Sequence, residues 1–175
     1  MICVLVLMTS GCKDEDKSSV VDSEYYNVLA CTVLKAIEDT YAQNIAGTTF
    51  QPDGLNVEVD APHGGTINIT GNVTDGGNGI SRVDLNYAFR DVRWLWSNTG
   101  SPMTADVTLN GVIHESGSFR PDDYKNLTAT SDNLSVTGTV TSSARTRDAD
   151  EYGKISLVWN MSKYNGDMFG YTVNN

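Results

Sequence analysis

The chain has 175 residues and a formal net charge of −10, with 22 acidic residues against 12 basic ones. Nucleic-acid-binding proteins usually carry a basic patch, so this balance argues against a nucleic-acid partner. The length is that of one domain, and the high content of Asn, Ser, Thr and Gly is typical of an exported, β-rich protein.

The first residues form an apolar run that ends in a small-residue segment. Residues 2–8 are continuously apolar, and Thr9, Ser10 and Gly11 precede Cys12. Such a run is too short to cross a bilayer as a helix but suits the core of a secretory signal. The segment 9–12 resembles the lipobox of bacterial lipoproteins, in which a small residue precedes a cysteine that is lipidated and becomes the mature N-terminus. The alternatives are an ordinary secretory signal and a buried N-terminal strand.

The resemblance implies both a processing site and a location. Residues 1–11 would be the signal peptide, and Cys12 would carry the acyl chains that attach the protein to the bacterial outer membrane. The charged run 13–16 resembles the Lys-acidic-acidic tags that send some Bacteroidetes lipoproteins to the cell surface. A solvated tether would have the same composition, so the periplasmic face and the cell surface both remain open.

The mature chain begins with a polar segment and continues with a helical pattern. Residues 12–22 predict a flexible tether, and residues 23–175 a single domain. Within residues 23–46, apolar side chains recur every three or four positions and end before Gly47, which predicts one amphipathic helix. Its stripe consists of Tyr26, Leu29, Val33, Ile37, Tyr41 and Ile45.

Cys31 lies beside this apolar stripe. It is the only thiol left if Cys3 leaves with the signal and Cys12 is acylated, so no disulfide is expected within the mature chain. We interpret Cys31 as a small, buried or half-buried filler rather than a reactive thiol.

After Gly47 the apolar period changes to two residues, which predicts strands with one buried face. The alternating runs span residues 55–59, 67–73, 83–89, 105–109, 134–140, 155–161 and 169–173. Turn-forming residues separate them, and Asn165-Gly166 is the strongest hairpin signal. Between Arg90 and Trp96 the apolar parity switches, which indicates either a bulge in one long strand or a tight turn. The predicted fold is α+β: one N-terminal amphipathic helix packed on a curved antiparallel β-meander of seven to eight strands.

Three strands place a glycine at an inward position, namely Gly71, Gly111 and Gly138. Glycine weakens a strand unless a bend, a bulge or a close approach uses its missing side chain. We interpret this row as the sign of a curved sheet whose concave face leaves room for a large group. The N-terminal helix or a tryptophan (Trp94, Trp96 or Trp159) could fill that room, and so could a ligand.

The sequence contains no motif for nucleophilic catalysis, phosphate binding or zinc binding. His63 and His114 lack partners at ligand spacing, and we predict neither a metal nor a cofactor. A group of acidic and amide side chains could bind calcium weakly, but it lacks the ligand spacing of a dedicated calcium loop. These residues are Asp75, Asn78, Asp148, Asp150 and Glu151.

Arginines surround the Trp94–Trp96 segment, the most conspicuous aromatic group of the chain. Aromatic rings flanked by hydrogen-bonding side chains could stack on a sugar or hold a protein partner. Core tryptophans that alternate with outward arginines would explain the same pattern without a ligand. The arginines are Arg82, Arg90 and Arg93.

Together these patterns favour a non-enzymatic binding or interaction module that a lipid anchor holds in the cell envelope. Its ligand could be a protein, a glycan or a lipid. One alternative is a carrier of a lipid or other apolar ligand between helix and sheet. Another is a hydrolase such as a glycosidase, whose paired carboxylates would come from loops.

Overall fold

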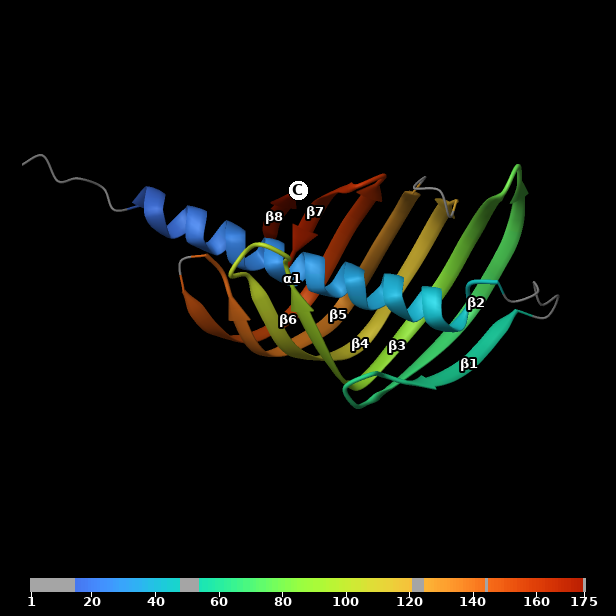
Figure 1. Cartoon of the computed structure of the whole chain (residues 1–175), viewed down its shortest axis with the longest axis horizontal. Coiled ribbons are helices and arrows are strands. Elements are labelled where there is room, and N and C mark those ends of the chain that lie inside the picture. Colours follow the sequence, from blue (N-terminus) through green and yellow to red (C-terminus); the bar gives the residue numbers. More distant parts are fainter. Residues whose placement is uncertain (1–14, 48–53, 121–124, 144, 175) are drawn as a thin grey trace, which may run out of the picture.

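The computed structural model describes residues 15–47, 54–120, 125–143 and 145–174, with side chains from residue 22 onward. One helix packs on an antiparallel sheet of eight strands that is not closed (Figure 1). The α+β class and the number of strands are therefore confirmed. The predicted signal 1–11 and Cys12 lie outside the described residues. The elements are α1 (Glu15–Asn44), β1 (Leu55–Asp60), β2 (Thr66–Gly77), β3 (Ile80–Ser97), β4 (Thr104–Phe119), β5 (Lys125–Thr141), β6 (Thr146–Asn160), β7 (Lys163–Met168) and β8 (Tyr171–Asn174).

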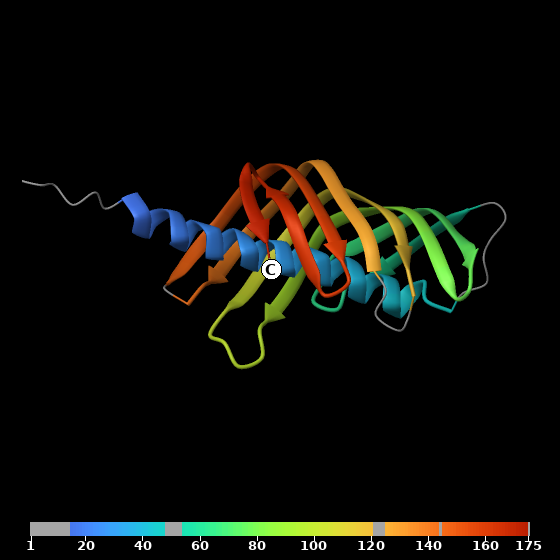
Figure 2. The same cartoon turned by 90° about the horizontal axis from the view of Figure 1, so that it is seen from above.

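The sheet is a simple meander, because its strands lie side by side in chain order from β1 to β8. Each neighbouring pair is antiparallel. Helix α1 lies across one face and contacts β3, β4, β5, β7 and β8. Figure 2 shows the same arrangement from above, with α1 running across the strands. The helix thus covers the middle and one side of the sheet.

Helix α1 begins earlier than predicted. It starts at Glu15 rather than near Ser23, so residues 15–22 of the predicted tether are helical. The segment 13–46 contains neither Gly nor Pro, so nothing in it interrupts a helix. In addition, Glu15 and Asp16 lie in the first turn, where the helix dipole favours negative charge. The helix ends at Asn44, just before Gly47, close to the predicted stop.

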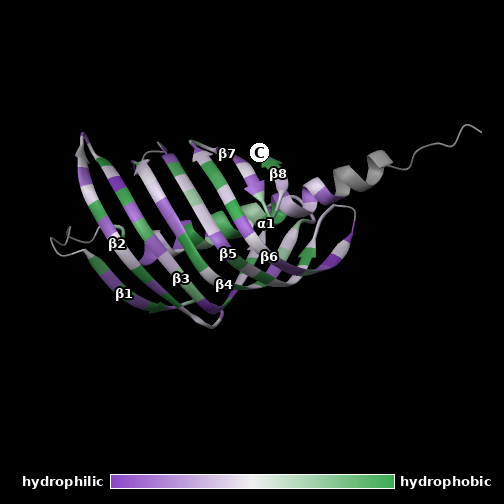
Figure 3. Cartoon of the chain, turned by 180° about the vertical axis from the view of Figure 1, so that it is seen from behind, coloured by the Kyte–Doolittle hydropathy of each residue, from purple (hydrophilic) through white to green (hydrophobic). Residues whose placement is uncertain are grey.

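The predicted helix stripe is the centre of the core. Leu29 and Val33 are 0% exposed, and Ile37 is buried equally well. They join the inward apolar side chains of the sheet in one hydrophobic cluster. Burial of one such side chain contributes about 1.5–3 kcal/mol. We call this apolar contact between α1 and the sheet the seam, and it holds the helix on the sheet. Figure 3 shows the opposite face of the sheet, where hydrophilic and hydrophobic residues alternate along the strands.

The parity switch between Arg90 and Trp96 is a bulge. The strand β3 continues through it, and its register against β4 shifts between Phe89 and Val92. Both of these side chains are buried, because the extra residues let the inward face change from odd to even positions. The alternative of a tight turn is wrong.

Several strands are longer than predicted, because polar segments that resemble turns continue the ladder. Residues 147–153 lie inside β6, and residues 131–133 lie inside β5 at a shift in its register against β6. The predicted hairpin turn at Asn165-Gly166 is wrong, since both residues lie inside β7 and pair with β6. Their composition resembles a turn, yet polar side chains also suit the wet face of a long strand.

Strands β7 and β8 cover only part of β6. Residues 155–160 of β6 pair with β7, whereas residues 146–153 pair with β5 alone among the described strands. Side chains from α1 hold this free part of β6 from the helix side. Arg147 donates to Asp22 at 2.6 Å, and Tyr25 and Tyr26 donate to Glu151 at 3.1 and 3.3 Å.

Candidate functional site

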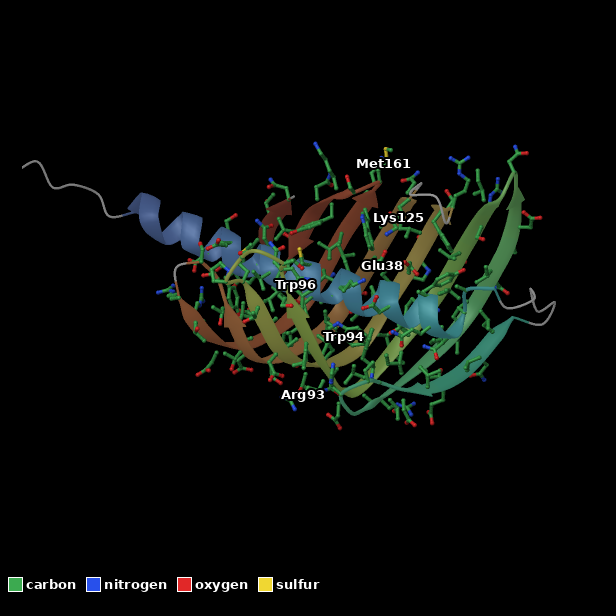
Figure 4. All side chains as sticks on the ribbon, in the orientation of Figure 1. Glu38, Arg93, Trp94, Trp96, Lys125 and Met161 are labelled. Carbon is green, nitrogen blue, oxygen red and sulfur yellow. The ribbon has the colours of Figure 1, made fainter. Side chains whose placement is uncertain are left out.

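A groove follows one flank of α1 from Ser23 to Ala46. Three hollows of about 650, 140 and 330 Å³ lie end to end along the helix, from its N-terminal to its C-terminal half. The first two share Cys31, Trp96 and Tyr164, and the last two share Glu38 and Trp159. We call this feature the α1 groove, and its parts the N-terminal, middle and C-terminal hollows. Figure 4 shows Trp96, Glu38 and Lys125 following one another along the helix.

The helical repeat explains the wall that α1 contributes. Groove residues recur every three or four positions, which places them on one flank of the helix, beside the buried stripe. They are Glu24, Asn27, Val28, Cys31, Leu34, Lys35, Glu38, Tyr41 and Ala42. The helix therefore presents one apolar face to the core and one mixed flank to the groove.

The sheet lines the groove with aromatic rings from four different strands. Trp96 ends β3, Phe119 ends β4, Trp159 lies near the end of β6, and Tyr164 belongs to β7. Trp96, Phe119 and Trp159 are half-buried. Because all four strands end beside the helix, rings that are distant in sequence lie along one groove.

The predicted pair Trp94 and Trp96 divides between core and groove. Trp94 is only 5% exposed and belongs to the hydrophobic cluster, whereas Trp96 lines the N-terminal and middle hollows. Arg93 points to the opposite face, where it donates to Asp106 at 2.8 and 2.7 Å (Figure 4). Arg90 contacts Glu58 there. The alternation of core tryptophan and outward arginine is therefore confirmed for Trp94, and these arginines do not flank Trp96.

The glycine row does not make room for a large group. A Cβ atom at Gly71, Gly111 or Gly138 would lie 2.1, 2.8 or 2.3 Å from a backbone oxygen of the neighbouring strand. The φ angles of +127°, +125° and +136° also disfavour any side chain. The missing side chains thus permit close approach between neighbouring strands, whose backbone lies where a Cβ atom would be.

Cys31 lies at the junction of the N-terminal and middle hollows and is half-buried. Its thiol donates to the Tyr164 hydroxyl at 3.2 Å, and that hydroxyl donates to the Asn27 carbonyl at 3.1 Å. Burial raises the pKa of the Cys31 thiol, which the hydrogen bond to Tyr164 offsets only in part. The thiol is therefore protonated at neutral pH, as expected for a packing residue.

In the N-terminal hollow, polar contacts tie α1 to distant parts of the sheet. Glu24 accepts from the backbone N–H of Ser143 at 3.1 Å and from its hydroxyl. The Asn27 side chain accepts from the backbone N–H of Asn174 at 2.9 Å. Asn98 and Met103, from the β3–β4 connection, complete the wall opposite the helix.

The C-terminal hollow contains a buried carboxyl group. Glu115, on β4, is 6% exposed and accepts a hydrogen bond of 2.8 Å from the hydroxyl of the fully buried Tyr87. Burial raises the pKa of Glu115 to about 7, although the bond from Tyr87 opposes this shift. The nearby charge of Glu38 raises it further, whereas Lys125 lowers it. Glu115 is therefore part protonated near neutral pH.

An ion pair and an aromatic ring stand beside this carboxyl group. Lys125 binds Glu38, and its Nζ lies 4.0 Å from the centroid of the Trp159 ring. Lys35 contacts the same carboxylate at 3.3 Å. Burial alone would raise the pKa of Glu38, but its bonds to Lys125 and the charge of Lys35 hold it below its usual value. Glu38 is thus ionised and neutralised, unlike Glu115.

Sequence reasoning missed Glu115. Its neighbour His114 points outward, and the alternation along β4 places Glu115 on the other face of the strand. That other face is the helix side: Ala105, Val107, Leu109 and Ile113 are all buried at odd positions, and Glu115 continues the series. A charged residue at a core position was the signal that could have identified it.

The described residues contain no group of three or more His, Cys, Asp and Glu side chains that could hold a metal ion. His114 lies 2.8 Å from Asp84. The acidic side chains that could bind calcium do not form one cluster. Asp75 accepts from the backbone N–H of Gly77 in the β2–β3 turn, whereas Asp148, Asp150 and Glu151 lie on β6.

The chain matches no known family model, no curated protein and no solved structure. Within the described residues, no helix has the length and apolar character needed to span a membrane. The geometry of the α1 groove is therefore the basis for a functional proposal.

Proposed function

We propose that this protein is a non-enzymatic binding module of the cell envelope that holds a small ligand in the α1 groove. In this proposal Cys12 carries the lipid anchor that fixes the module to the outer membrane. The observation that supports it is the groove itself, whose aromatic rings and polar side chains line hollows of about 650 and 330 Å³. Ligand sites are typically concave, mostly apolar and furnished with a few polar groups.

The two ends of the groove suit different parts of one ligand. The N-terminal hollow offers amides and Trp96, while the C-terminal hollow offers Trp159, Phe119 and charged groups. Residues from α1 and from several strands contribute at each end, so the site exists only in the folded domain.

The lipid-carrier alternative has less support. We infer that the sheet curves around α1, since the helix contacts strands from β3 to the edge strand β8. The helix then occupies the place where a carrier would hold its lipid, and Leu29 and Val33 fill the seam. The hydrolase alternative also has less support, because Lys125 and Lys35 neutralise Glu38 and Tyr87 binds Glu115.

A fluorine NMR experiment tests binding in the groove. Incorporation of 5-fluorotryptophan gives signals for Trp94, Trp96 and Trp159, of which Trp94 is an internal control in the core. Soluble amines, oligosaccharides and short peptides are then titrated in turn. We expect a true ligand to shift the signals of Trp96 or Trp159 and to leave that of Trp94 in place. If every responsive compound moved only Trp94, or none moved a groove signal, the proposal would be wrong.

A separate experiment tests the anchor. The variant Cys12→Ala cannot be acylated at this position, so we expect it to leave the membrane fraction, whereas the control Cys31→Ala remains attached. Membranes are washed with high salt and with carbonate before immunoblotting. Retention of Cys12→Ala after both washes would show that Cys12 is not the anchor.

A further inference from the structure

The C-terminal hollow combines aromatic walls with a buried acid that forms no ion pair with the described residues. Tyr41, Phe119 and Trp159 form much of its wall. Glu115 faces this hollow, and among the described residues its one hydrogen bond comes from the neutral hydroxyl of Tyr87. Buried carboxylates are ordinarily paired, because an unpaired charge loses its hydration without compensation. The hollow therefore holds an acid whose charge a ligand can balance.

The two acids of the hollow, Glu38 and Glu115, differ in their ion pairs. Glu38 is matched by Lys125 and Lys35. Arg120 also lines the hollow and makes a contact of its own. The charge of Lys125 lowers the pKa of Glu115, but Lys125 is paired with Glu38. Among the described residues, Glu115 is therefore the acid of this hollow that has no ion pair of its own.

Lys125 illustrates what the hollow accommodates. Its ammonium group contacts a carboxylate and lies over the face of Trp159, 4.0 Å from the ring centroid. Aromatic faces attract cations through the negative charge of their π system, and aromatic sites use this attraction to bind organic ammonium ligands. The protein's own side chain thus shows one ammonium held by an acid and a ring in this place.

We propose that the C-terminal hollow binds the ammonium group of a small organic amine, with Glu115 as its counter-ion and the rings of Tyr41, Phe119 and Trp159 around its apolar body. This inference rests on the proposed function and names the ligand class for one end of the α1 groove. The volume of about 330 Å³ admits an amine with a body the size of one aromatic ring. Lys125 stays on Glu38, so the ligand takes the second acid rather than displacing the lysine.

Binding then depends on the ionisation of Glu115. The groups that face it are Glu38 and Tyr41 of α1, Tyr87 of β3 and Lys125 of β5. Arg120, just beyond β4, lines the same hollow, and His114 acts on Glu115 only through its charge, from the opposite face of the strand. Because the pKa of Glu115 is about 7, its carboxylate predominates above that pH and its neutral form below. The affinity for an amine is therefore expected to rise as the pH increases through 7.

The test compares three probes of nearly equal size: 2-phenylethylamine, 2-phenylethanol and 3-phenylpropanoate. Titrations follow the 5-fluorotryptophan signal of Trp159, with calorimetry as a second readout. At about pH 8 we expect the amine to bind roughly tenfold more tightly than the alcohol, and the acid to bind least. The variant Glu115→Gln keeps the acceptor for Tyr87 and should lose the preference for the amine. Glu58→Gln, on the opposite face, is the matched control and should retain it.

Each failure has a distinct meaning. Equal affinity for amine and alcohol, or an unchanged preference in a folded Glu115→Gln, would overturn the ammonium assignment while leaving the groove as a site. If Glu115→Gln does not fold, the pH titration of the unmodified protein decides, since amine affinity that does not change between about pH 5.5 and 8 is incompatible with Glu115 as the counter-ion. A Trp159 signal that moves with other ligands and with none of these probes would refute the inference and preserve the proposed function.

Discussion

The two sides of α1 differ in how completely the sheet covers them. On the buried side, Leu29, Val33 and Ile37 pack against the inward side chains of the strands. On the groove side, Cys31, Glu38 and Tyr41 meet half-buried rings and charged groups across hollows. One helix thus contributes both to the core and to the wall of the groove. Its buried side packs against the middle of the strands, and its groove side faces the strand ends.

This division separates stability from binding. A substitution on the buried side should unfold the domain, because close packing leaves no place for a charge or an extra atom. A substitution in the groove should change ligand binding at little cost in stability, because its neighbours can move into open space.

The largest effect is expected on the buried side. Val33→Asp places an unpaired carboxylate in the seam and should lower the free energy of unfolding by roughly 3 to 5 kcal/mol. Gln43→Asp, on the exposed side of the same helix, is the control and should change little. Urea denaturation measures both. An unchanged midpoint for Val33→Asp would show that α1 is not docked through this seam.

Glu115 should make stability depend on pH. In the folded protein its pKa is about 7, against 4.5 for the free side chain, so the folded state binds more protons between these values. Stability therefore falls as the pH rises from 4.5 to 7, and remains lower above that range. The shift corresponds to about 3 kcal/mol.

Glu115→Gln should remove this dependence and stabilise the protein at about pH 8 by a comparable amount. Thermal unfolding at a series of pH values measures the effect. A variant that is less stable than the parent at every pH would indicate that the carboxylate is favourably bound in the folded state.

A substitution that disturbs the close approach between β2 and β3 is expected to have an intermediate effect on the free energy of unfolding. Gly71→Ala places a Cβ atom 2.1 Å from the Asp84 carbonyl oxygen, so β2 and β3 must separate. We expect a loss of about 2 kcal/mol or more. Gly100→Ala shares a positive φ but has no atom within 4 Å of the added Cβ, so it isolates the cost of backbone strain. Equal losses in both variants would exclude the steric explanation.

The smallest effect on stability is expected in the groove. Trp159→Leu removes the ring beneath Lys125, an interaction of about 0.5 to 1 kcal/mol at a partly exposed site. Thermal unfolding should therefore change little, whereas amine binding measured by calorimetry should fall severalfold. A collapse in stability would assign Trp159 to the core rather than to the groove.

The spacing of apolar residues along the chain predicted the buried faces of the helix and strands. The stripe Tyr26 to Ile45, the alternation around Leu85 and Tyr87, and the bulge near Asp91 all follow from the spacing of apolar residues. The start of α1 was missed because charged residues suit a tether and a helix equally. The turn at Asn165-Gly166 was wrong because its residue types permit a turn without requiring one.

The groove depends on contacts that sequence spacing does not reveal. Trp96 and Tyr164 lie 68 positions apart and meet only because β3 and β7 end beside the same stretch of helix. The glycine row was noticed, but its cause is the backbone of a neighbouring strand, which no side-chain pattern records. Glu115 could have been predicted to point inward, though its partner Tyr87 could not.

The unequal lengths of β6 and β7 have a consequence for self-association. Among the described residues, 146–153 of β6 end the sheet on that side, and an open strand edge is a template on which another chain can add a strand. Arg147 and Glu151 point toward α1 and are held there by Asp22, Tyr25 and Tyr26, while Asp148 and Asp150 are exposed on the other face. An incoming strand would meet acidic side chains on one face and the body of the helix on the other. The acidity of this short segment thus disfavours the addition of a strand from a second copy of the chain along the open edge.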